Sequence, residues 1–472
     1  MKANLFVWML LLLLLNLAAA QRPATPAATN SAATNAATKP AGLSDAEIGL
    51  ASGTNQPGFL LDNKSAATNA EPGTWLKYQH SAKLTEADRK LLEEELKRLT
   101  ADFAVKWSRK AAEQGDAFAQ YYLGYCYANG QGVAKDEVEA VKWYRKAAEQ
   151  NYAAAQCGLG LCYAKGEGVA KDEVEAVKWY RKAAEQNLAQ AQCNLGYCYY
   201  YGKGVTKDVA EAVKWWRKAA EQNYAEAQYN LGVCYHDGQG VAKDEVEAVK
   251  WYRKAAEQNH AQAQYNLGVS YANGQGVAKD EVEAVKWYRK AAEQNHAPAQ
   301  FILGVKYANG DGVAQDYVEA VKWYRKAAEQ GMTEAQCALG SCYYAGRGVP
   351  KDYAQALYWF RRAAAQGDAG GQVMLGASYA DGIGVPRNDI EAYKWLTLGA
   401  AQNIPEVLRQ AAAKSLNTVE ARMSREEIVE AQRFAAAFVP RNESQAQEKG
   451  AGFDFIAESI MRPKPERFRL KG

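Results

Sequence analysis

A tryptophan recurs every 36 residues along most of this 472-residue chain. Nine tryptophans keep the interval without exception: Trp107, Trp143, Trp179, Trp215, Trp251, Trp287, Trp323, Trp359 and Trp395. A fixed period of this length is typical of repeat architectures, in which one short structural unit is copied and stacked. The period therefore constrains the fold more than the chain length does, since length alone predicts about three ordinary domains.

Each tryptophan belongs to a copy of one sequence pattern. The pattern is complete from Asn223 to Glu257, where it runs NYAEAQYNLGVCYHDGQGVAKDEVEAVKWYRKAAE. Eight full copies occupy residues 116–403, and a half copy at residues 101–115 precedes them. We number the copies one to eight in chain order.

The first half of a copy has the spacing of an amphipathic helix. Gln228, Leu231, Gly232 and Tyr235 lie at intervals of three and four residues and so share one face, which is expected to pack inward. A glycine inside a helix costs about 1 kcal/mol relative to alanine. Its recurrence in every copy predicts that another backbone, that of the second helix of the copy, crosses closely at this point.

The second half of a copy begins with a glycine turn. Gly238 and Gly240 can adopt the positive φ that ends a helix, and Asp244 with Glu247 three residues later matches an aspartate version of the capping box. Asn259 is suited to the left-handed position after this helix, as are the glycines that replace it in later copies. The buried stripe of the second helix is expected to be Ala248, Trp251, Ala255 and Ala256.

Neither helix can bury its apolar stripe alone, so neighbouring copies must stack on one another. The sequence therefore predicts an all-α protein, an α-solenoid built from 36-residue helix-turn-helix repeats.

The regions outside the copies have other compositions. Residues 1–20 carry Lys2, an apolar run and a small-residue end, which predicts a secretory signal peptide cleaved before Gln21; an uncleaved N-terminal anchor is the alternative. Residues 21–83 are rich in Ala, Thr, Asn and Pro and are expected to form a disordered spacer. We expect capping helices with the half copy at 84–115, C-terminal capping helices at 404–440 and a flexible tail at 441–472.

The shared pattern A-x-A-Q-x-x-L-G-x-x-Y-x-x-G-x-G-V-x-x-D-x-x-E-A-x-x-W-x-x-K-A-A resembles the Sel1-like repeat (SLR), a relative of the tetratricopeptide repeat. The resemblance covers about residues 101–440, with departures such as Gly371, Asn388 and Gly399 in the last copies. It implies a right-handed superhelix that serves as a protein-interaction scaffold, often exported in bacteria. The family has no shared catalytic residue that could be assigned to this chain.

Internal comparison points to a candidate binding surface. The second helices are nearly identical from copy to copy, whereas the first helices vary at positions three and four residues apart, on one face distinct from the Leu-Gly face. We call this side of the first helices the variable face; similarity to tetratricopeptide repeats places it in a concave groove. The alternative is that its side chains only pack between adjacent first helices. The candidate partner-binding residues are Phe118, Tyr121, Tyr125, Tyr197, Tyr200, Glu226, Tyr229, His236, Gln262, Tyr265, Phe301 and Tyr344.

Charge and reactive residues argue against several other functions. Lys and Arg total 57 and Asp and Glu 54, and the resulting net charge of +3 is too small to favour nucleic acid. Cysteines five residues apart on one helix, such as Cys157 and Cys162, cannot form a disulfide, while bridges between neighbouring copies stay open; free buried thiols are favoured. No metal site or cofactor is expected.

No catalytic residue is assigned. The chain has four histidines and no Ser-x-x-Lys motif, so the penicillin-binding activity ascribed to some cysteine-rich relatives lacks its serine nucleophile here. His260 and His296 occupy the same place in successive copies and are expected to be surface or packing residues.

The sequence therefore predicts an exported, non-catalytic scaffold, periplasmic or extracellular, that binds a protein or peptide. A binder of envelope glycan, in which Tyr197, Tyr200 and Tyr201 stack on sugar rings, is the alternative, followed by an enzyme of the penicillin-binding type.

Overall fold

The computed structural model describes residue 102 and residues 104–440. Residues 104–113 are helical. The described residues form further α-helices and no strand. The predicted signal peptide, the spacer, most of the N-terminal capping region and the tail at 441–472 lie outside the described residues. No helix in the described ranges is long and apolar enough to cross a membrane.

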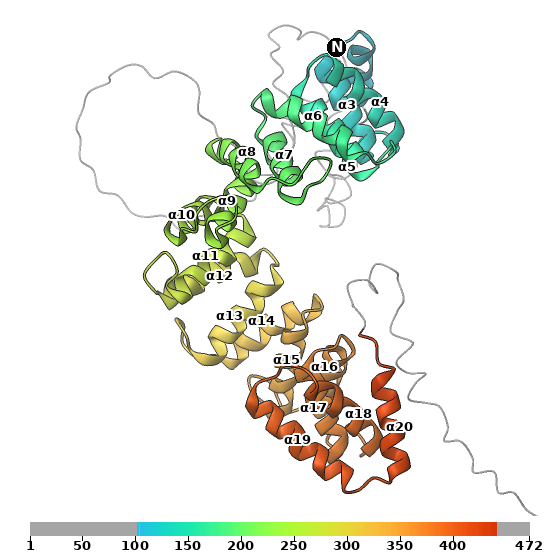
Figure 1. Ribbon diagram of the computed structural model, residues 1–472, viewed down its shortest axis with the longest axis vertical. Helices are drawn as coiled ribbons and strands as arrows, with labels where there is room; N and C mark the ends of the chain where they lie inside the picture. The colour runs from blue at the N-terminus through green and yellow to red at the C-terminus, as the bar shows by residue number, and fades with distance from the viewer. Residues whose placement is uncertain (1–101, 103, 441–472) are drawn as a thin grey trace, which may run out of the picture. The chain divides into compact units, whose positions relative to one another are not determined.

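Each full copy forms two helices in the order predicted. The first helices are α3 (Ala117–Asn129), α5 (Ala153–Lys165), α7 (Ala189–Tyr201), α9 (Ala225–Asp237), α11 (Ala261–Asn273), α13 (Ala297–Asn309), α15 (Thr333–Ala345) and α17 (Ala369–Asp381). The second helices are α4 (Glu137–Glu149), α6 (Glu173–Glu185), α8 (Val209–Glu221), α10 (Glu245–Glu257), α12 (Glu281–Glu293), α14 (Tyr317–Glu329), α16 (Tyr353–Ala365) and α18 (Asp389–Ala400). The all-α solenoid of helix-turn-helix copies is confirmed (Figure 1).

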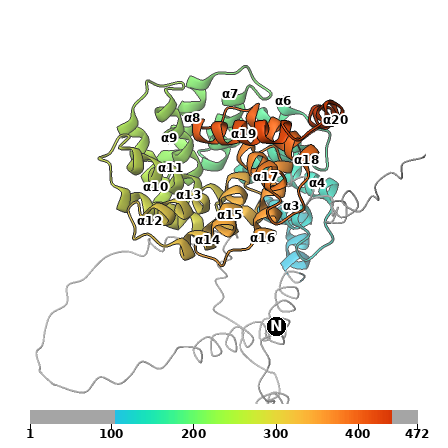
Figure 2. The same ribbon diagram turned by 90° about the horizontal axis from the view of Figure 1, so that it is seen from below.

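The described residues fall into two compact units. The first extends to Ala191 and includes Lys203–Thr206, and the second comprises Gln192–Gly202 and the residues from Lys207 onward. Within the second unit, Figure 2 shows the first helices α9, α11, α13 and α15 on the inner side of the stack and the second helices α10, α12, α14 and α16 on the outer side. The variable face therefore belongs to the inner helices of this unit.

The ends of the helices follow from single residues. Gly238 ends α9 with a φ of 71°, and Asn259 after α10 adopts a φ of 63°, both as expected. Asp244 caps α10 by accepting a hydrogen bond from the backbone N–H of Glu247 at 2.9 Å. The predicted capping box is only half formed, because the Glu247 carboxylate instead accepts from Lys250 Nζ at 2.9 Å.

The helical glycine makes room for an aromatic ring in copies one to seven and for a leucine in copy eight. A Cβ on Gly232 would lie 2.5 Å from the ring of Tyr252, and a Cβ on Gly268 would lie 2.7 Å from the ring of Tyr288. The second helix does cross at this point, as the sequence predicts. The closest neighbour is a side-chain ring rather than its backbone, and the same notch takes Trp216 in copy three, Phe360 in copy seven and Leu396 in copy eight.

The second glycine of the turn sets the contact between copies. A Cβ on Gly276 would lie 2.0 Å from the backbone oxygen of Glu245 in the preceding copy, and a Cβ on Gly312 would lie 2.2 Å from that of Glu281. Glycine is needed there for close backbone approach as well as for its positive φ.

Most of the periodic tryptophans are buried between successive copies, whereas Trp107 of the half copy is 53% exposed. Trp287 is 6% exposed and packs in one cluster with Ala255 and Ala256 of the preceding copy and Leu267 of its own first helix. The predicted buried stripe of the second helix is confirmed, and it also includes Val249 and Tyr252, which are 4% and 3% exposed. A lysine lies over each of several tryptophan rings, as Lys290 Nζ does at 4.1 Å from the Trp287 ring centroid.

A ladder of buried glutamines adds polar contacts between copies. Gln264, which is fully buried, donates to the backbone oxygen of Ala256 in the preceding copy at 3.0 Å and accepts from Gln294 at 2.7 Å. The same pair of bonds recurs in other copies, for example at Gln228 with Ala220 and Gln258. Each rung satisfies a carbonyl at the end of a second helix.

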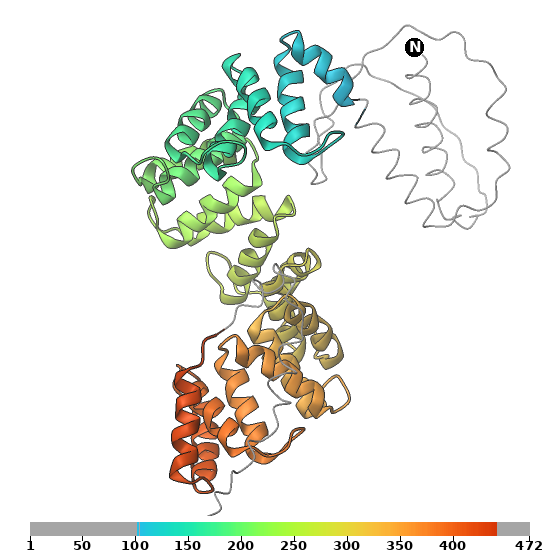
Figure 3. The ribbon, with the colours of Figure 1, turned by 90° about the vertical axis from the view of Figure 1, so that its right-hand side faces the viewer.

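Two further helices cover the last copy. α19 (Glu406–Glu420) and α20 (Arg425–Ala436) lie in the region where the sequence predicts C-terminal capping helices, and Figure 3 shows them packed beside the α17 and α18 pair. Ala412, Val419 and Ala431 from these helices are fully buried in one cluster with Leu396. Ser424 and Glu427 form a complete capping box at the start of α20.

The close contact between the helical glycine and the aromatic ring predicts opposite effects for two glycines of α5. Gly160→Ala is expected to lower the free energy of unfolding by about 1–3 kcal/mol, because its Cβ would lie 2.8 Å from the Tyr180 ring. Gly158→Ala is expected to raise it by up to about 1 kcal/mol, because its Cβ would meet only ordinary contacts at 3.5 Å with Tyr144. Urea unfolding followed by circular dichroism measures both, and equal effects of the two substitutions would contradict the notch.

The glutamine ladder predicts a measurable polar contribution to stability. Gln264→Met keeps the size of the side chain but removes both hydrogen bonds. We expect a loss of about 1–3 kcal/mol because the Gln294 amide loses its acceptor and the Ala256 carbonyl keeps only its bond from the Asn259 N–H. Gln275→Met is the control, since that turn residue accepts one long bond of 3.4 Å from Asn273. Thermal unfolding of the two variants compares them directly; an unchanged midpoint for Gln264→Met would argue against the ladder.

Candidate functional site

A row of aromatic rings follows the variable face of the second unit. Tyr229, Tyr265 and Phe301 occupy equivalent places in successive copies and are half-buried. Tyr229 lies 6.1 Å from the ring of Tyr252, and Tyr265 lies 5.8 Å from the ring of Tyr288. Each ring thus rests on the aromatic residue that fills the glycine notch, which fixes its position.

The rings also contact the start of the next first helix. Tyr229 lies 5.0 Å from the His260 ring, in a stacked arrangement, and Tyr265 lies 5.2 Å from the His296 ring. These aromatic residues therefore pack between copies and still retain an exposed part. Both interpretations made from the sequence, recognition and packing, are compatible with this position.

The predicted residues of copy one lie in the first unit. Phe118 lies 6.4 Å from both the Tyr122 and the Tyr152 rings, and Tyr121 lies 5.4 Å from the Tyr152 ring. Tyr125 is half-buried and packs against the core cluster formed around α4 and α5. Copy one therefore presents an aromatic group of its own.

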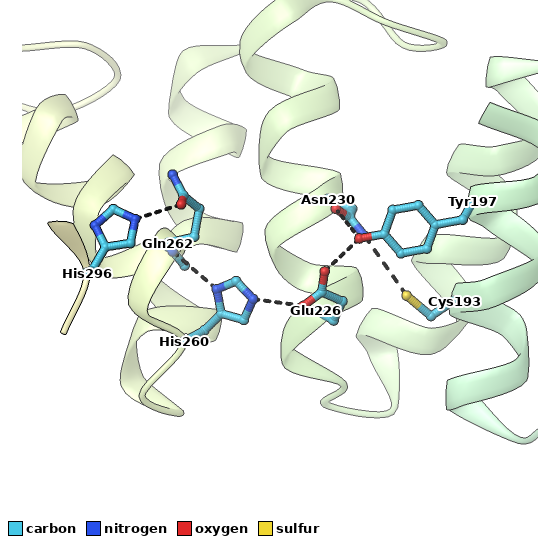
Figure 4. Close-up of polar contacts among 8 residues, drawn as sticks. Cys193, Tyr197, Glu226, Asn230, His260, Gln262 and His296 are labelled. Atoms are coloured by element: carbon cyan, nitrogen blue, oxygen red, sulfur yellow. Dashed lines mark hydrogen bonds and ion pairs between the residues drawn. The ribbon is translucent and has the colours of Figure 1, made fainter. Parts of the chain in front are cut away.

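A polar network connects copies three, four and five of the second unit (Figure 4). Tyr197 donates to Glu226 Oε1 at 2.6 Å, and its hydroxyl also lies 3.4 Å from the Asn230 side-chain oxygen. The Asn230 amide in turn lies 3.9 Å from Cys193 Sγ. Two predicted site residues, Tyr197 and Glu226, are therefore brought together.

Two histidines extend this network as helix caps. His260 Nδ1 accepts from the backbone N–H of Ala263 at 3.2 Å, so its proton is on Nε2, which lies 3.0 Å from Glu226 Oε2. His296 caps α13 in the same way and directs Nε2 to Gln262 Oε1 at 2.8 Å. The two histidines are packing residues, as expected, but with a specific capping role that the sequence did not indicate.

The network changes the acidity of its members. The hydrogen bond from His260 lowers the pKa of Glu226, so this carboxyl is held in its charged form. Burial, with a further contribution from the Glu226 carboxylate, raises the pKa of Tyr197. Burial lowers the pKa of His296 from 6.5, which favours the neutral imidazole that the cap requires.

The other predicted residues lie near the ends of the first helices. The Tyr200 hydroxyl hydrogen-bonds Gln239 in the turn of the next copy. His236 Nδ1 pairs with Glu245 Oε2 at 2.7 Å, and Tyr344 lies 5.4 Å from the Tyr353 ring. His236 and Tyr344 lie apart from the network of Tyr197 and Glu226. Tyr200 is connected to it through Trp216, whose ring lies 5.3 Å from the Tyr200 ring and 5.5 Å from the Tyr197 ring.

One ion pair between a first helix, α13, and the preceding second helix, α12, was missed from the sequence. Lys306 replaces the cysteine or serine of all other copies and pairs with Glu281 of the preceding copy at 2.7 Å, with a side chain 14% exposed. This pair lowers the pKa of Glu281. The substitution of a lysine at an otherwise small buried position was the available signal.

The cysteines of the described region are free thiols, and seven of the eight are buried. Burial raises the pKa of Cys234 to about 12, which makes this thiol a poor nucleophile. Among residues 104–440, no three His, Cys, Asp or Glu side chains gather closely enough to hold a metal ion.

Comparison with protein families decides the identity of the repeat. The Sel1 repeat model matches nine consecutive segments, at residues 101–116, 117–152, 153–188, 189–224, 225–260, 261–296, 297–332, 333–368 and 369–404. The chain belongs to the Sel1 repeat family. Sel1 repeat proteins typically mediate protein–protein interactions and are generally non-catalytic scaffolds.

Solved structures of other Sel1 repeat proteins are similar to this chain. A Sel1 repeat protein from Oxalobacter formigenes is 34% identical over 66% of this chain and 89% of its own, with a TM-score of 0.49. A protective antigen of uropathogenic Escherichia coli with an SLR fold is 29% identical over 78% of this chain and 99% of its own, with a TM-score of 0.44. Cysteine rich protein B of Helicobacter pylori is 30% identical over 27% of this chain and 92% of its own, with a TM-score of 0.23. No curated protein matches the chain.

The histidine cap of α13 predicts a pH dependence of stability. Since the pKa of His296 is lowered in the folded state, stability is fully present above the ordinary imidazole pKa and is lost as the pH falls, because the unfolded chain takes up the proton first. His296→Asn retains a capping side chain that does not titrate. We expect the melting temperature of this variant to fall less than that of the natural chain between about pH 7.5 and about pH 5.5. An identical fall in both proteins would show that the cap does not titrate as inferred.

Proposed function

We propose that this Sel1 repeat protein is an exported, non-catalytic scaffold that binds a segment of a partner protein along the variable face of the second unit. The row formed by Tyr229, Tyr265 and Phe301 is the observation that carries the proposal. These rings are held in place from below by the notch aromatics and keep an exposed part on consecutive first helices. Tyrosine is favoured in recognition because a large rigid ring is ordered at low entropic cost.

The distribution of charge supports the choice of this face over the outer helices. On α9, α11 and α13 the charged residues are Glu226, Asp237 and Lys306; Glu226 is hydrogen-bonded by His260, and Lys306 is paired with Glu281. The outer helices instead carry internal pairs such as Lys250 with Glu247 at 2.9 Å. Exposed pairs of this kind form a solvated surface and contribute little to recognition.

An envelope glycan is the second candidate ligand because tyrosines also stack on sugar rings. The cluster of Tyr197, Tyr200 and Tyr201 favours it, since the Tyr197 and Tyr201 rings lie parallel with centroids 6.2 Å apart. A protein partner accounts for the longer row of rings as well, and we therefore place it first.

The first test concerns the partner surface. Tyr229→Ala combined with Tyr265→Ala removes two adjacent rings, and we expect a protein captured by crosslinking from the envelope fraction of the source organism to be lost, with at least a tenfold decrease in recovery. Lys250→Gln with Lys286→Gln is the matched control on the outer helices of the same copies and should leave recovery unchanged. Quantitative mass spectrometry measures both.

Recovery that is unchanged in the tyrosine variant would contradict the assignment of the variable face. A decrease in the lysine control would move the binding surface to the outer helices. Purified cell wall, added as a competitor, shows whether glycan takes the same surface.

The second test concerns export. We expect the full chain, expressed in a secreting bacterium, to reach the periplasm or medium and to begin at Gln21, because small residues precede that position. Intact mass measurement identifies the new N-terminus. Leu12→Arg interrupts the apolar run and should keep the protein uncut inside the cell; a natural chain that remains uncut in the cytoplasm would refute export.

A further inference from the structure

Copy three departs from the other copies at the last turn of its first helix. Tyr200 and Tyr201 stand where copies one, five and six have an alanine followed by an asparagine. α7 has the same length as the first helices of those copies, so the fold does not need tyrosines at these two places. The residue in the glycine notch is also larger, because Trp216 replaces the tyrosine of most other copies.

The four aromatic residues form one cluster with an exposed surface. Tyr200 lies 4.8 Å from the Tyr201 ring and 5.3 Å from the Trp216 ring, and Tyr197 lies 5.5 Å from the Trp216 ring. Trp216 is 2% exposed and donates from Nε1 to the backbone oxygen of Cys193 at 3.1 Å, whereas Tyr201 is 59% exposed. The cluster is therefore fixed at its base and open at Tyr201.

The same copy leaves a lysine without its usual carboxylate. In copies one, two, four and five the lysine before the capping aspartate pairs with the glutamate that opens the second helix, at distances from 2.7 to 3.3 Å, as Lys243 does with Glu245. Copy three keeps the lysine, Lys207, but has Val209 in place of the glutamate. No carboxylate in the described part of the chain pairs with Lys207, and its Nζ lies 5.9 Å from the Tyr200 ring centroid.

We propose that Tyr200, Tyr201 and Lys207 anchor an acidic segment of the partner protein. A carboxylate of that segment pairs with Lys207, and a neighbouring apolar or aromatic side chain covers the exposed face of Tyr201. The missing glutamate makes Lys207 complementary to a negative charge from outside the chain. This inference deepens the proposed function and rests on it, since it names the chemistry of the partner at one end of the variable face.

The hydroxyl groups of the cluster favour a peptide over a sugar. Tyr197 and Tyr200 already use their hydroxyls on Glu226 and Gln239, so the rings offer mainly apolar surface. An apolar side chain needs only such a surface, whereas a sugar also needs several hydrogen-bonding groups directed at its hydroxyls.

The test begins with a phage-displayed library of random dodecapeptides selected on the full chain. We expect the enriched peptides to carry Asp or Glu beside an aromatic residue or leucine. The leading peptide, labelled with fluorescein, is then titrated by anisotropy against variants that copy other repeats: Tyr200→Ala with Tyr201→Asn, as in copy five, and Lys207→Gln, as in copy six. Because other copies fold with these residues, the variants are expected to keep the native circular dichroism spectrum.

We expect the tyrosine variant to weaken binding about tenfold or more, and Lys207→Gln about fivefold. Replacing the acidic residue of the peptide by its amide should weaken binding to the natural chain equally but have no further effect on Lys207→Gln, as a coupled pair requires. Lys279→Gln, which removes the paired lysine of copy five, is the control and should leave binding unchanged.

Peptides without acidic residues, or independent effects of the peptide and Lys207 substitutions, would overturn the anchor. If the affinity for the leading peptide is unchanged by the copy-three substitutions but is lost after Tyr229→Ala with Tyr265→Ala, the anchor is overturned. The proposed function then still stands. Peptides that depend on neither surface, or a selection without any binder, would count against both.

Discussion

The side chain that each second helix places in the glycine notch of its own first helix, an aromatic ring in copies one to seven, sets the geometry of the copy. A Cβ on Gly232 would lie 2.5 Å from the Tyr252 ring. The position therefore requires glycine, and the ring cannot move away from the first helix without leaving a cavity. The turn glycine fixes the neighbouring copy in the same way, through close approach to a backbone carbonyl such as that of Glu245. Because these two contacts and the tryptophan core already join the copies, the variable face is free to differ from copy to copy.

That freedom explains how a nearly uniform scaffold can acquire a specific surface. The same ring that fills the notch in copies four and five supports Tyr229 and Tyr265 on the variable face, so structural and exposed aromatics form one stack. Where the notch residue enlarges to Trp216, the exposed cluster above it enlarges as well. A side chain such as Tyr229 therefore serves two roles: one part of its ring packs against the neighbouring copies, and its exposed part is available for recognition.

The sequence predicted the features that follow from the 36-residue period and from the backbone conformations that glycine and asparagine favour. The helix pairs, the buried Trp251 stripe, the left-handed Asn259 and the crossing at Gly232 all follow from spacing and from the properties of glycine and asparagine. The glutamine rungs and the pair of Lys306 with Glu281 were missed, because they depend on which side chains of different copies come within hydrogen-bond distance. The histidine caps are local, but histidine is not among the residue types that signal a helix N-terminus. The capping box is only half formed, since the Glu247 carboxylate is held by Lys250, three residues further along the same helix.

Site-specific photo-crosslinking tests most directly the claim that the variable face carries the function. Benzoylphenylalanine replaces Tyr229 or Tyr265 on the inner helices, or the exposed Val246 or Val282 on the outer helices of the same copies, and the protein is irradiated in cells of the source organism. We expect one common crosslinked protein from the two inner positions and none from the outer positions. Crosslinks from the valine positions alone would contradict it.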